Sequence, residues 1–140
     1  MKKIRKMVRG FTLIELLIVL AVIAALLAIA TPVALNAVAQ AKATQVASNL
    51  RNIRSAAESF VMINKTATGL SIDNLKTQGY LTNTAGLENY RITATQAATV
   101  VTAQIVYTGG VDIDKLRGIL PEATRTGNNV TYSFSIPIWW

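Results

Sequence analysis

The chain has 140 residues, among them 14 basic and 7 acidic side chains, with a formal net charge of +7 and neither cysteine nor histidine. Its length allows one small domain besides a membrane segment. The lack of cysteine excludes a disulfide, and the lack of histidine removes the commonest metal ligand and general base. No catalytic or metal-ligating constellation is visible, so we expect neither an enzyme nor a metal or cofactor.

The positive charge is concentrated at the N-terminus, where five basic residues and no acidic one precede Gly10. Nine basic and seven acidic side chains are scattered over the rest of the chain, without the aromatic interleaving of a nucleic-acid site. DNA is therefore a weakly supported partner. A basic segment before an apolar run instead indicates that this end stays in the cytoplasm.

The apolar run extends over 20 residues, Phe11–Ala30, and contains one charge, Glu15. Twenty residues of helix cover the roughly 30 Å of a bilayer's hydrocarbon core. A carboxylate inside a membrane is costly and by default indicates a functional site. The run offers no basic side chain as its partner. Cleavage between Gly10 and Phe11 would supply an α-amino group and would also remove the basic leader.

The sequence Gly10-Phe11-Thr12-Leu13-Ile14-Glu15-Leu16, followed by an unbroken apolar helix, resembles the class III signal peptide of type IV pilins and pseudopilins. The resemblance covers roughly the first 50 residues. It implies that a prepilin peptidase cuts after Gly10 and methylates the new N-terminus at Phe11. It also implies that Glu15 is the carboxylate used in filament assembly.

The fold class expected from this resemblance is α+β and pilin-like, with a long N-terminal helix packed on a small antiparallel sheet of three or four strands. Residues 1–10 would be the cleaved basic leader and 11–64 the long helix, with 11–31 as the transmembrane segment and filament core. Residues 65–140 would form a globular head with a connector loop and the sheet.

Two other interpretations of the N-terminus remain open. One is an ordinary secretory signal with a small-x-small cleavage site at Ala28-Ile29-Ala30. The other is a plain membrane anchor. Glu15 inside the apolar region and the continuation of the helical pattern beyond Ala30 argue against a secretory signal.

Pro32 follows the apolar run. Proline removes a backbone hydrogen bond and clashes with the preceding turn of a helix, at about 3 kcal/mol in an exposed helix. In a membrane or a helix bundle, neighbouring groups can compensate for this loss. We therefore predict a kink or a locally unwound segment near Pro32, where the helix leaves the bilayer; a helix end at this position is the alternative.

Beyond Pro32 the sequence still has a helical pattern. Apolar residues recur at spacings of four, three, four and three, which places them on one helical face: Val46, Leu50, Ile53, Ala57 and Phe60. Arg54 and Glu58 stand one turn apart and are predicted to pair. This part of the helix should cover the head, and residues 64–69 should end it.

The head contains two predicted caps and three strand-like segments. Ser71 should cap a short turn that Gly79 ends, and Asp112 should cap a short helix that ends near Gly118 and Pro121. The strands are predicted at residues 90–95, 99–107 and 130–136. Some pseudopilins hold calcium in this region, but Asp112 and Asp114 are too few ligands for it, so a helix cap is favoured.

The chain ends with Trp139 and Trp140, and two large apolar side chains are rarely left fully exposed on a soluble head. They either fold back on the head's own core or contact a neighbouring subunit or surface.

Together these features predict a structural subunit of a type IV pilus, a surface filament for adhesion, motility or DNA uptake. Its partners would be many copies of itself, the prepilin peptidase and the pilus assembly machinery. It would span the inner membrane once before assembly and then reach the cell surface. The small head favours a major pilin; the alternatives are a minor pilin, a type II secretion pseudopilin, or a membrane-tethered module that binds DNA or a surface.

Overall fold

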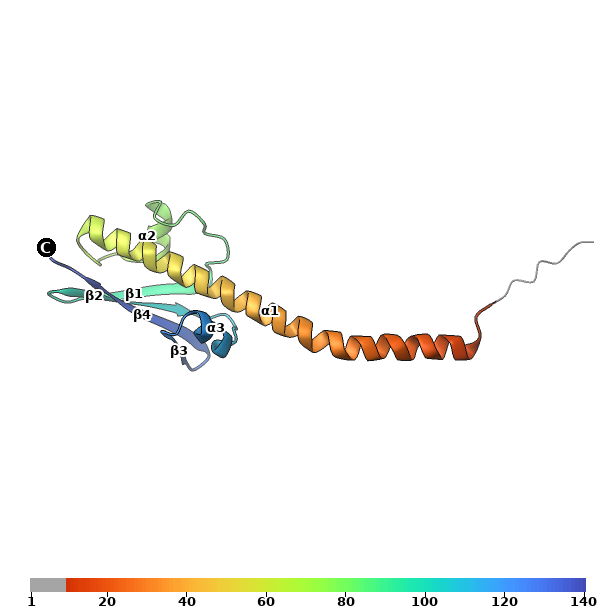
Figure 1. Ribbon diagram of the computed structural model, residues 1–140. Helices are drawn as coiled ribbons and strands as arrows, with labels where there is room; N and C mark the ends of the chain where they lie inside the picture. Colours follow the sequence, from red (N-terminus) through yellow and green to blue (C-terminus); the bar gives the residue numbers. More distant parts are fainter. Residues whose placement is uncertain (1–9) are drawn as a thin grey trace, which may run out of the picture. The chain divides into compact units, whose positions relative to one another are not determined.

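The computed structural model describes residues 10–140, so the predicted leader, apart from Gly10, lies outside the described residues. The elements are α1 (Leu13–Asn64), α2 (Ile72–Thr77), β1 (Tyr90–Gln96), β2 (Val100–Tyr107), α3 (Ile113–Ile119), β3 (Ala123–Thr126) and β4 (Asn129–Pro137) (Figure 1). The long helix and small antiparallel sheet confirm the predicted α+β, pilin-like fold. The chain divides into two compact units, Met1–Ala37 and Val38–Trp140.

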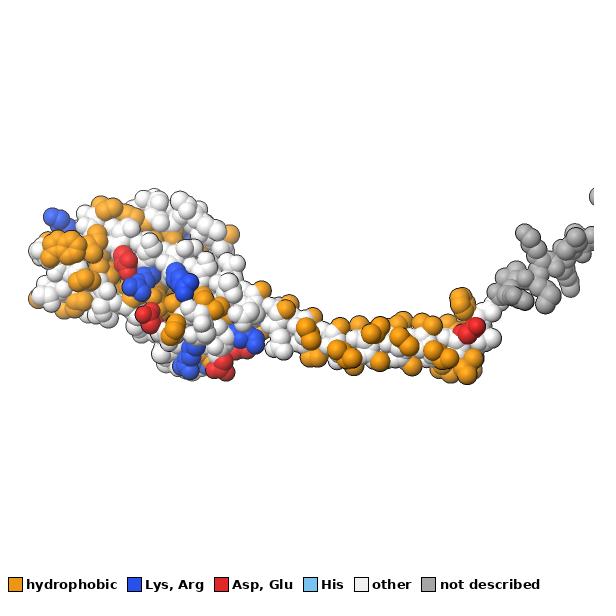
Figure 2. Space-filling view, viewed as in Figure 1, with side chains coloured by type: hydrophobic (Ala, Val, Ile, Leu, Met, Phe, Trp, Pro, Cys, Tyr) orange, Lys and Arg blue, Asp and Glu red, His pale blue; other side chains and the backbone are white. Residues whose placement is uncertain are grey.

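The described part of the first unit is the apolar beginning of α1. An 18-residue window of this helix reaches a mean hydropathy of 3.0, and none of that window is buried. Figure 2 shows its hydrophobic side chains uncovered along the helix. By length and composition α1 can cross a membrane, and within residues 10–140 it is the one helix that meets this criterion.

Pro32 lies in the interior of α1, and every residue from Leu13 to Asn64 is helical. The structure therefore has no unwound segment at Pro32, nor does the helix end there. Thr31, the preceding residue, donates a hydrogen bond from its hydroxyl to the Leu27 carbonyl oxygen at 2.8 Å. Bonds of this kind are tolerated inside helices and often bend them. Opening of the helix near Pro32 in an assembled filament stays a prediction.

In the second unit, the remainder of α1 supplies one side of the head's core. All five residues of the predicted apolar face are buried, as expected: Val46, Leu50, Ile53, Ala57 and Phe60. The helix ends at Asn64, and Lys65 follows in the left-handed conformation with φ of 53°. Leu75 of α2 and Leu116 of α3 complete the core at its edges and are fully buried.

The sheet is antiparallel throughout, in the order β1-β2-β4-β3. Ile105 of β2 lies between Ile92 of β1 and Tyr132 of β4, and all three side chains are buried. The opposite face is polar: Thr93, Gln104 and Ser133 lie side by side and are exposed. This alternation is what a sheet with one covered face requires.

Strand β3 was not among the three predicted segments. It has four residues, of which Ala123 alone is buried, so it carries no detectable alternation of its own. Its position comes from pairing with β4 across the turn at Gly127, whose φ is 62°.

The two predicted caps are confirmed: Ser71 accepts from the Asn74 amide, and Asp112 accepts from the amides of Asp114 and Lys115.

Candidate functional site

The segment that begins α1 holds the residues for which we predicted processing and assembly. Gly10, Phe11 and Thr12 precede the helix, and Phe11 is 85% exposed. The Gly10–Phe11 peptide bond therefore lies in non-helical chain. Phe11 and Glu15 border the same shallow hollow on the surface of the helix, together with Ile18 and Val19.

Thr12 and Glu15 bond reciprocally at the first turn of α1. The Thr12 amide donates to Glu15 Oε2 at 2.7 Å, and the Glu15 amide donates to Thr12 Oγ1 at 3.3 Å. This is a capping box, which satisfies two backbone donors that a helix start otherwise leaves unpaired. The sequence contains this Thr-x-x-Glu pattern. The role predicted for Glu15 in filament assembly was nevertheless based on its charge, and the capping hydrogen bonds were not predicted.

The capping box gives the Glu15 carboxylate a hydrogen-bond partner within its own chain. In this chain Phe11 has no free amine, and the Glu15 carboxylate accepts a hydrogen bond from its own helix start instead. A neutral amide satisfies one oxygen but leaves the charge uncompensated. The arrangement thus holds the carboxylate at the N-terminal end of α1, where the helix dipole also favours a negative charge.

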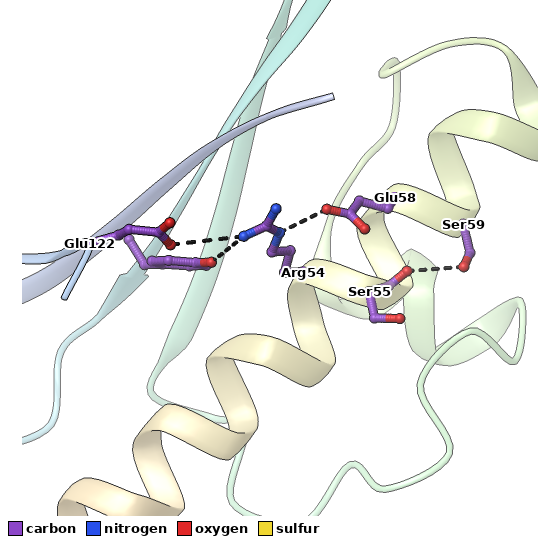
Figure 3. Close-up of polar contacts among 6 residues, drawn as sticks. Arg54, Ser55, Glu58, Ser59 and Glu122 are labelled. Carbon is purple, nitrogen blue, oxygen red and sulfur yellow. Dashed lines mark hydrogen bonds and ion pairs between the residues drawn. The ribbon is translucent and has the colours of Figure 1, made fainter. Parts of the chain in front are cut away.

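A second polar site lies in the head, centred on Arg54 of α1. Its Nε contacts Glu58 Oε1 at 2.7 Å, its Nη1 donates to the Tyr132 hydroxyl at 2.6 Å, and Glu122 Oε2 lies 3.8 Å from Nη1. Figure 3 shows Arg54 between the two carboxylates. We call these four residues the Arg54 cluster. The predicted Arg54–Glu58 pair is confirmed, whereas Tyr132 and Glu122 were missed because they come from distant parts of the chain.

The electrostatics of the Arg54 cluster favour a permanently charged guanidinium. The hydrogen bond to Glu58, and then that to Tyr132, raise the pKa of Arg54 above its ordinary value. Burial raises the pKa of Tyr132, while the bond from Arg54 opposes this. The guanidinium also lies 6.0 Å from the ring centre of Tyr132 and 5.4 Å from that of Phe134, within cation–π range.

The contacts of Arg54 stabilise the fold of the head, because they join α1 to Tyr132 of β4 and to Glu122. Arg51, one turn earlier, donates to the Ile119 carbonyl oxygen at 2.7 Å and so holds the end of α3. Both arginines line an open cleft of about 520 Å³ beside Leu120 and Pro121. The guanidinium groups are thus engaged by the protein itself.

Two further tyrosine hydroxyls contact α1. Asn49 donates to Tyr90 of β1 at 3.3 Å, and Asn64 donates to Tyr80 at 3.4 Å. Burial raises the pKa of Tyr90 to about 12, an effect that the bond from Asn49 reduces. Side-chain bonds from three positions of α1 therefore reach tyrosines of the head. Sequence periodicity identified the apolar face of α1 but not these polar contacts beside it.

The N-terminal segment agrees with a known family of motifs. The family model described as the prokaryotic N-terminal methylation motif matches residues 5–31, which include Gly10, Phe11 and Glu15. No curated protein and no solved structure matches the chain. The match ends before the head begins, so it identifies the processing signal and the first part of α1. The chain thus carries a class III signal peptide of the type IV pilin kind.

Proposed function

We propose that this chain is a pilin, the structural subunit of a type IV pilus. A prepilin peptidase cuts between Gly10 and Phe11 and methylates Phe11; the assembly machinery then moves the subunit from the inner membrane into a surface filament. The observation that carries the proposal is the uncovered apolar start of α1, with Glu15 in its first turn. Such a surface requires either lipid or other copies of the same helix around it.

Glu15 selects the position at which a subunit joins the filament. Cleavage turns Phe11 into a cation, and an incoming Glu15 is attracted to the Phe11 amine of the subunit added before it. Among apolar helices a paired charge is tolerated far better than an unpaired one, so one axial register is favoured. The Thr12 amide, which Glu15 contacts in the single chain, is the weaker, neutral partner in this competition.

The head supports the role of a major pilin, which forms the body of the filament. It consists of one four-stranded sheet, two short helices and the second half of α1, with connections too short to hold a further domain. A minor pilin or secretion pseudopilin is the alternative. Abundance of the protein in sheared filaments distinguishes them, because a major pilin must be their main component.

The proposal is tested by the intact mass and N-terminal sequence of the protein sheared from cells. A mature chain that begins at Phe11 and carries the mass of one additional methyl group is expected. A chain that begins at Thr31, after Ala30, would mean an ordinary secretory signal. In that case Glu15 would be absent from the mature protein and the proposal would be wrong.

A further inference from the structure

Strand β1 forms one edge of the sheet, and its backbone groups alternate in direction. Its neighbour in the sheet is β2, on one side. The Thr108 amide donates to the Asn89 carbonyl oxygen at 3.0 Å, immediately outside the two paired strands. In an antiparallel ladder every second opposite pair is hydrogen-bonded, so residues 91, 93 and 95 of β1 bond to β2. The amides and carbonyls of Ile92 and Ala94 therefore point to the free edge.

The free edge of β1 is closed at both ends and open in the middle. Near its start, the Tyr90 amide donates to the Leu87 carbonyl oxygen at 3.1 Å. At its end, Gln96 Oε1 accepts a hydrogen bond from the Ala67 amide at 2.9 Å. In the described part of the chain, the outward backbone groups between these two points bond to no other residue. Unpaired edge groups of this kind are a template for a further strand.

The two edges of the sheet differ in how well they are protected. Proteins usually prevent pairing at an edge with a short strand, proline, lysine or a bulge. Strand β3, at the other edge, has four residues. Strand β1 has seven, none of them proline or lysine, and its register with β2 is continuous. The addition of a further strand is therefore favoured at β1.

A groove of about 430 Å³ lies beside this edge, between α2 and β1. Its lining residues on the side of α2 are Ser71, Asp73 and Lys76, and those on the side of β1 include Glu88, Arg91 and Ile92. Because Ile92 is among them, the groove reaches the open middle of the edge. A groove between a helix and an edge strand accommodates a single extended peptide, whereas the edge of a second folded sheet would collide with the helix.

The C-terminus does not cover this groove. The Trp140 indole nitrogen donates to the Lys65 carbonyl oxygen at 3.0 Å, so this side chain folds back on the head, as one of the two alternatives predicted. Trp139 is 77% exposed. Neither tryptophan belongs to the lining of the groove, which is therefore open to a partner.

Charged side chains of both signs line the groove: Asp73, Glu88, Lys76 and Arg91. Within residues 10–140, none of the four takes part in an ion pair or in a hydrogen bond of its side chain. Their charges cancel, so the groove does not select a partner by net charge. It instead favours a partner that carries both acidic and basic side chains.

We propose that this groove binds an extended peptide segment of another protein, which adds to the sheet as a strand beside β1. The outward backbone groups of Ile92 and Ala94 hold the main chain of the peptide, and the charged side chains of the groove select among peptides. The inference goes beyond the proposed role as a pilin and does not depend on it, because the head supplies every group involved.

Selection from a phage-displayed library of random peptides tests this site, with the full chain held in detergent micelles that cover the apolar start of α1. We expect enriched peptides with both acidic and basic residues, and fluorescence anisotropy of a labelled peptide measures their binding. Ala94→Pro should weaken this binding by about tenfold, because it removes an outward donor while the ladder with β2 keeps its bonds. The matched control, Ala94→Ser, keeps the amide and should bind as wild type does.

A second measurement leaves the protein unchanged and decides the question if Ala94→Pro does not fold. Enriched peptides are synthesised with a methyl group on one backbone amide at a time. In a peptide that pairs with β1 every second amide faces the edge, so weaker binding should recur at alternate positions.

Three results would overturn the proposal: a selection without enriched peptides, equal binding to wild type and to folded Ala94→Pro, or methylation effects that do not alternate. Dimers of the wild-type chain that Ala94→Pro abolishes would assign the edge to a second copy of the chain, and would overturn the proposal as well.

Discussion

Arg54 of α1 donates a hydrogen bond to the hydroxyl of Tyr132 of β4 at 2.6 Å, across 78 positions of sequence. The same guanidinium contacts Glu58 on its own helix and lies near Glu122 before β3. A small head without disulfides has few means to fix a long helix on a sheet. In this head the Arg54 cluster supplies one such link, with three chain segments joined at one side chain.

We predict that Tyr132→Phe lowers the free energy of unfolding by about 1 kcal/mol. The change keeps the ring in the core and removes a bond to a charged group, and partial exposure of Arg54 reduces the loss. Denaturant unfolding of the full chain in detergent measures it. Glu58→Ala is the control: it removes a partly exposed ion pair within α1 and should cost less than about 0.5 kcal/mol. Equal losses in both variants would refute a special role for the link to β4.

We predict that Asp112→Ala lowers the thermal midpoint of the head by a few degrees, because α3 loses the side chain that caps its first turn. Hydrogen bonds from the amides of Lys115 and Asp114, with the charge of Lys115, lower the pKa of Asp112. Its contribution is therefore present above about pH 4 and is lost as the pH falls further through this lowered pKa.

The two interpretations of Asp112, as a helix cap and as a calcium ligand, predict different responses of the thermal midpoint to calcium. A cap is insensitive to metal, so neither calcium nor a chelator should shift the midpoint of the wild-type protein. Asp114→Ala serves as the matched variant, because its carboxylate is not the one that accepts the amide bonds. A midpoint that rises with calcium in wild type but not in Asp114→Ala would favour a metal site.

The sequence predicted those parts of the structure that depend on local patterns. The buried face of α1, the caps at Ser71 and Asp112, and the alternation of β4 all follow from residues close together in the chain. Strand β3 and the contacts of Arg54 with Tyr132 and Glu122 arise from pairing between distant segments. The capping box at Thr12 is local and could have been predicted from its Thr-x-x-Glu spacing, as the caps of the head were.

We predict that alkaline pH lowers the free energy of unfolding of the head, because the head has buried tyrosines. Burial raises the pKa of Tyr90 to about 12, so the folded state keeps the phenol proton more tightly than the unfolded chain, whose tyrosines titrate near pH 10. The resulting stability is complete below about pH 10 and is lost as the pH rises toward 12. Denaturant unfolding at about pH 9 and about pH 11 should show a smaller loss in Tyr90→Phe than in wild type. An identical loss in both would exclude Tyr90 as the group responsible.

The carboxylate and the capping bonds of the first turn can be separated by two substitutions. Glu15→Ala should give a processed, membrane-held subunit that enters filaments at least tenfold less, because the Phe11 amine of the preceding subunit then has no partner. Thr12→Val removes the hydroxyl that accepts from the Glu15 amide but keeps the carboxylate. Its filament yield should stay within a factor of about three of wild type, since charge pairing outweighs a single neutral hydrogen bond.

Immunoblots of sheared filaments and of the membrane fraction measure both variants, and the mass of the membrane-held chain confirms cleavage at Gly10. Glu15→Gln refines the test, because it retains the shape and the hydrogen-bonding oxygen of the side chain without its charge. Its yield should match that of Glu15→Ala if the charge selects the register. Assembly of Glu15→Gln at the wild-type level would instead mean that the capping box, which a glutamine can also complete, is the feature that assembly requires.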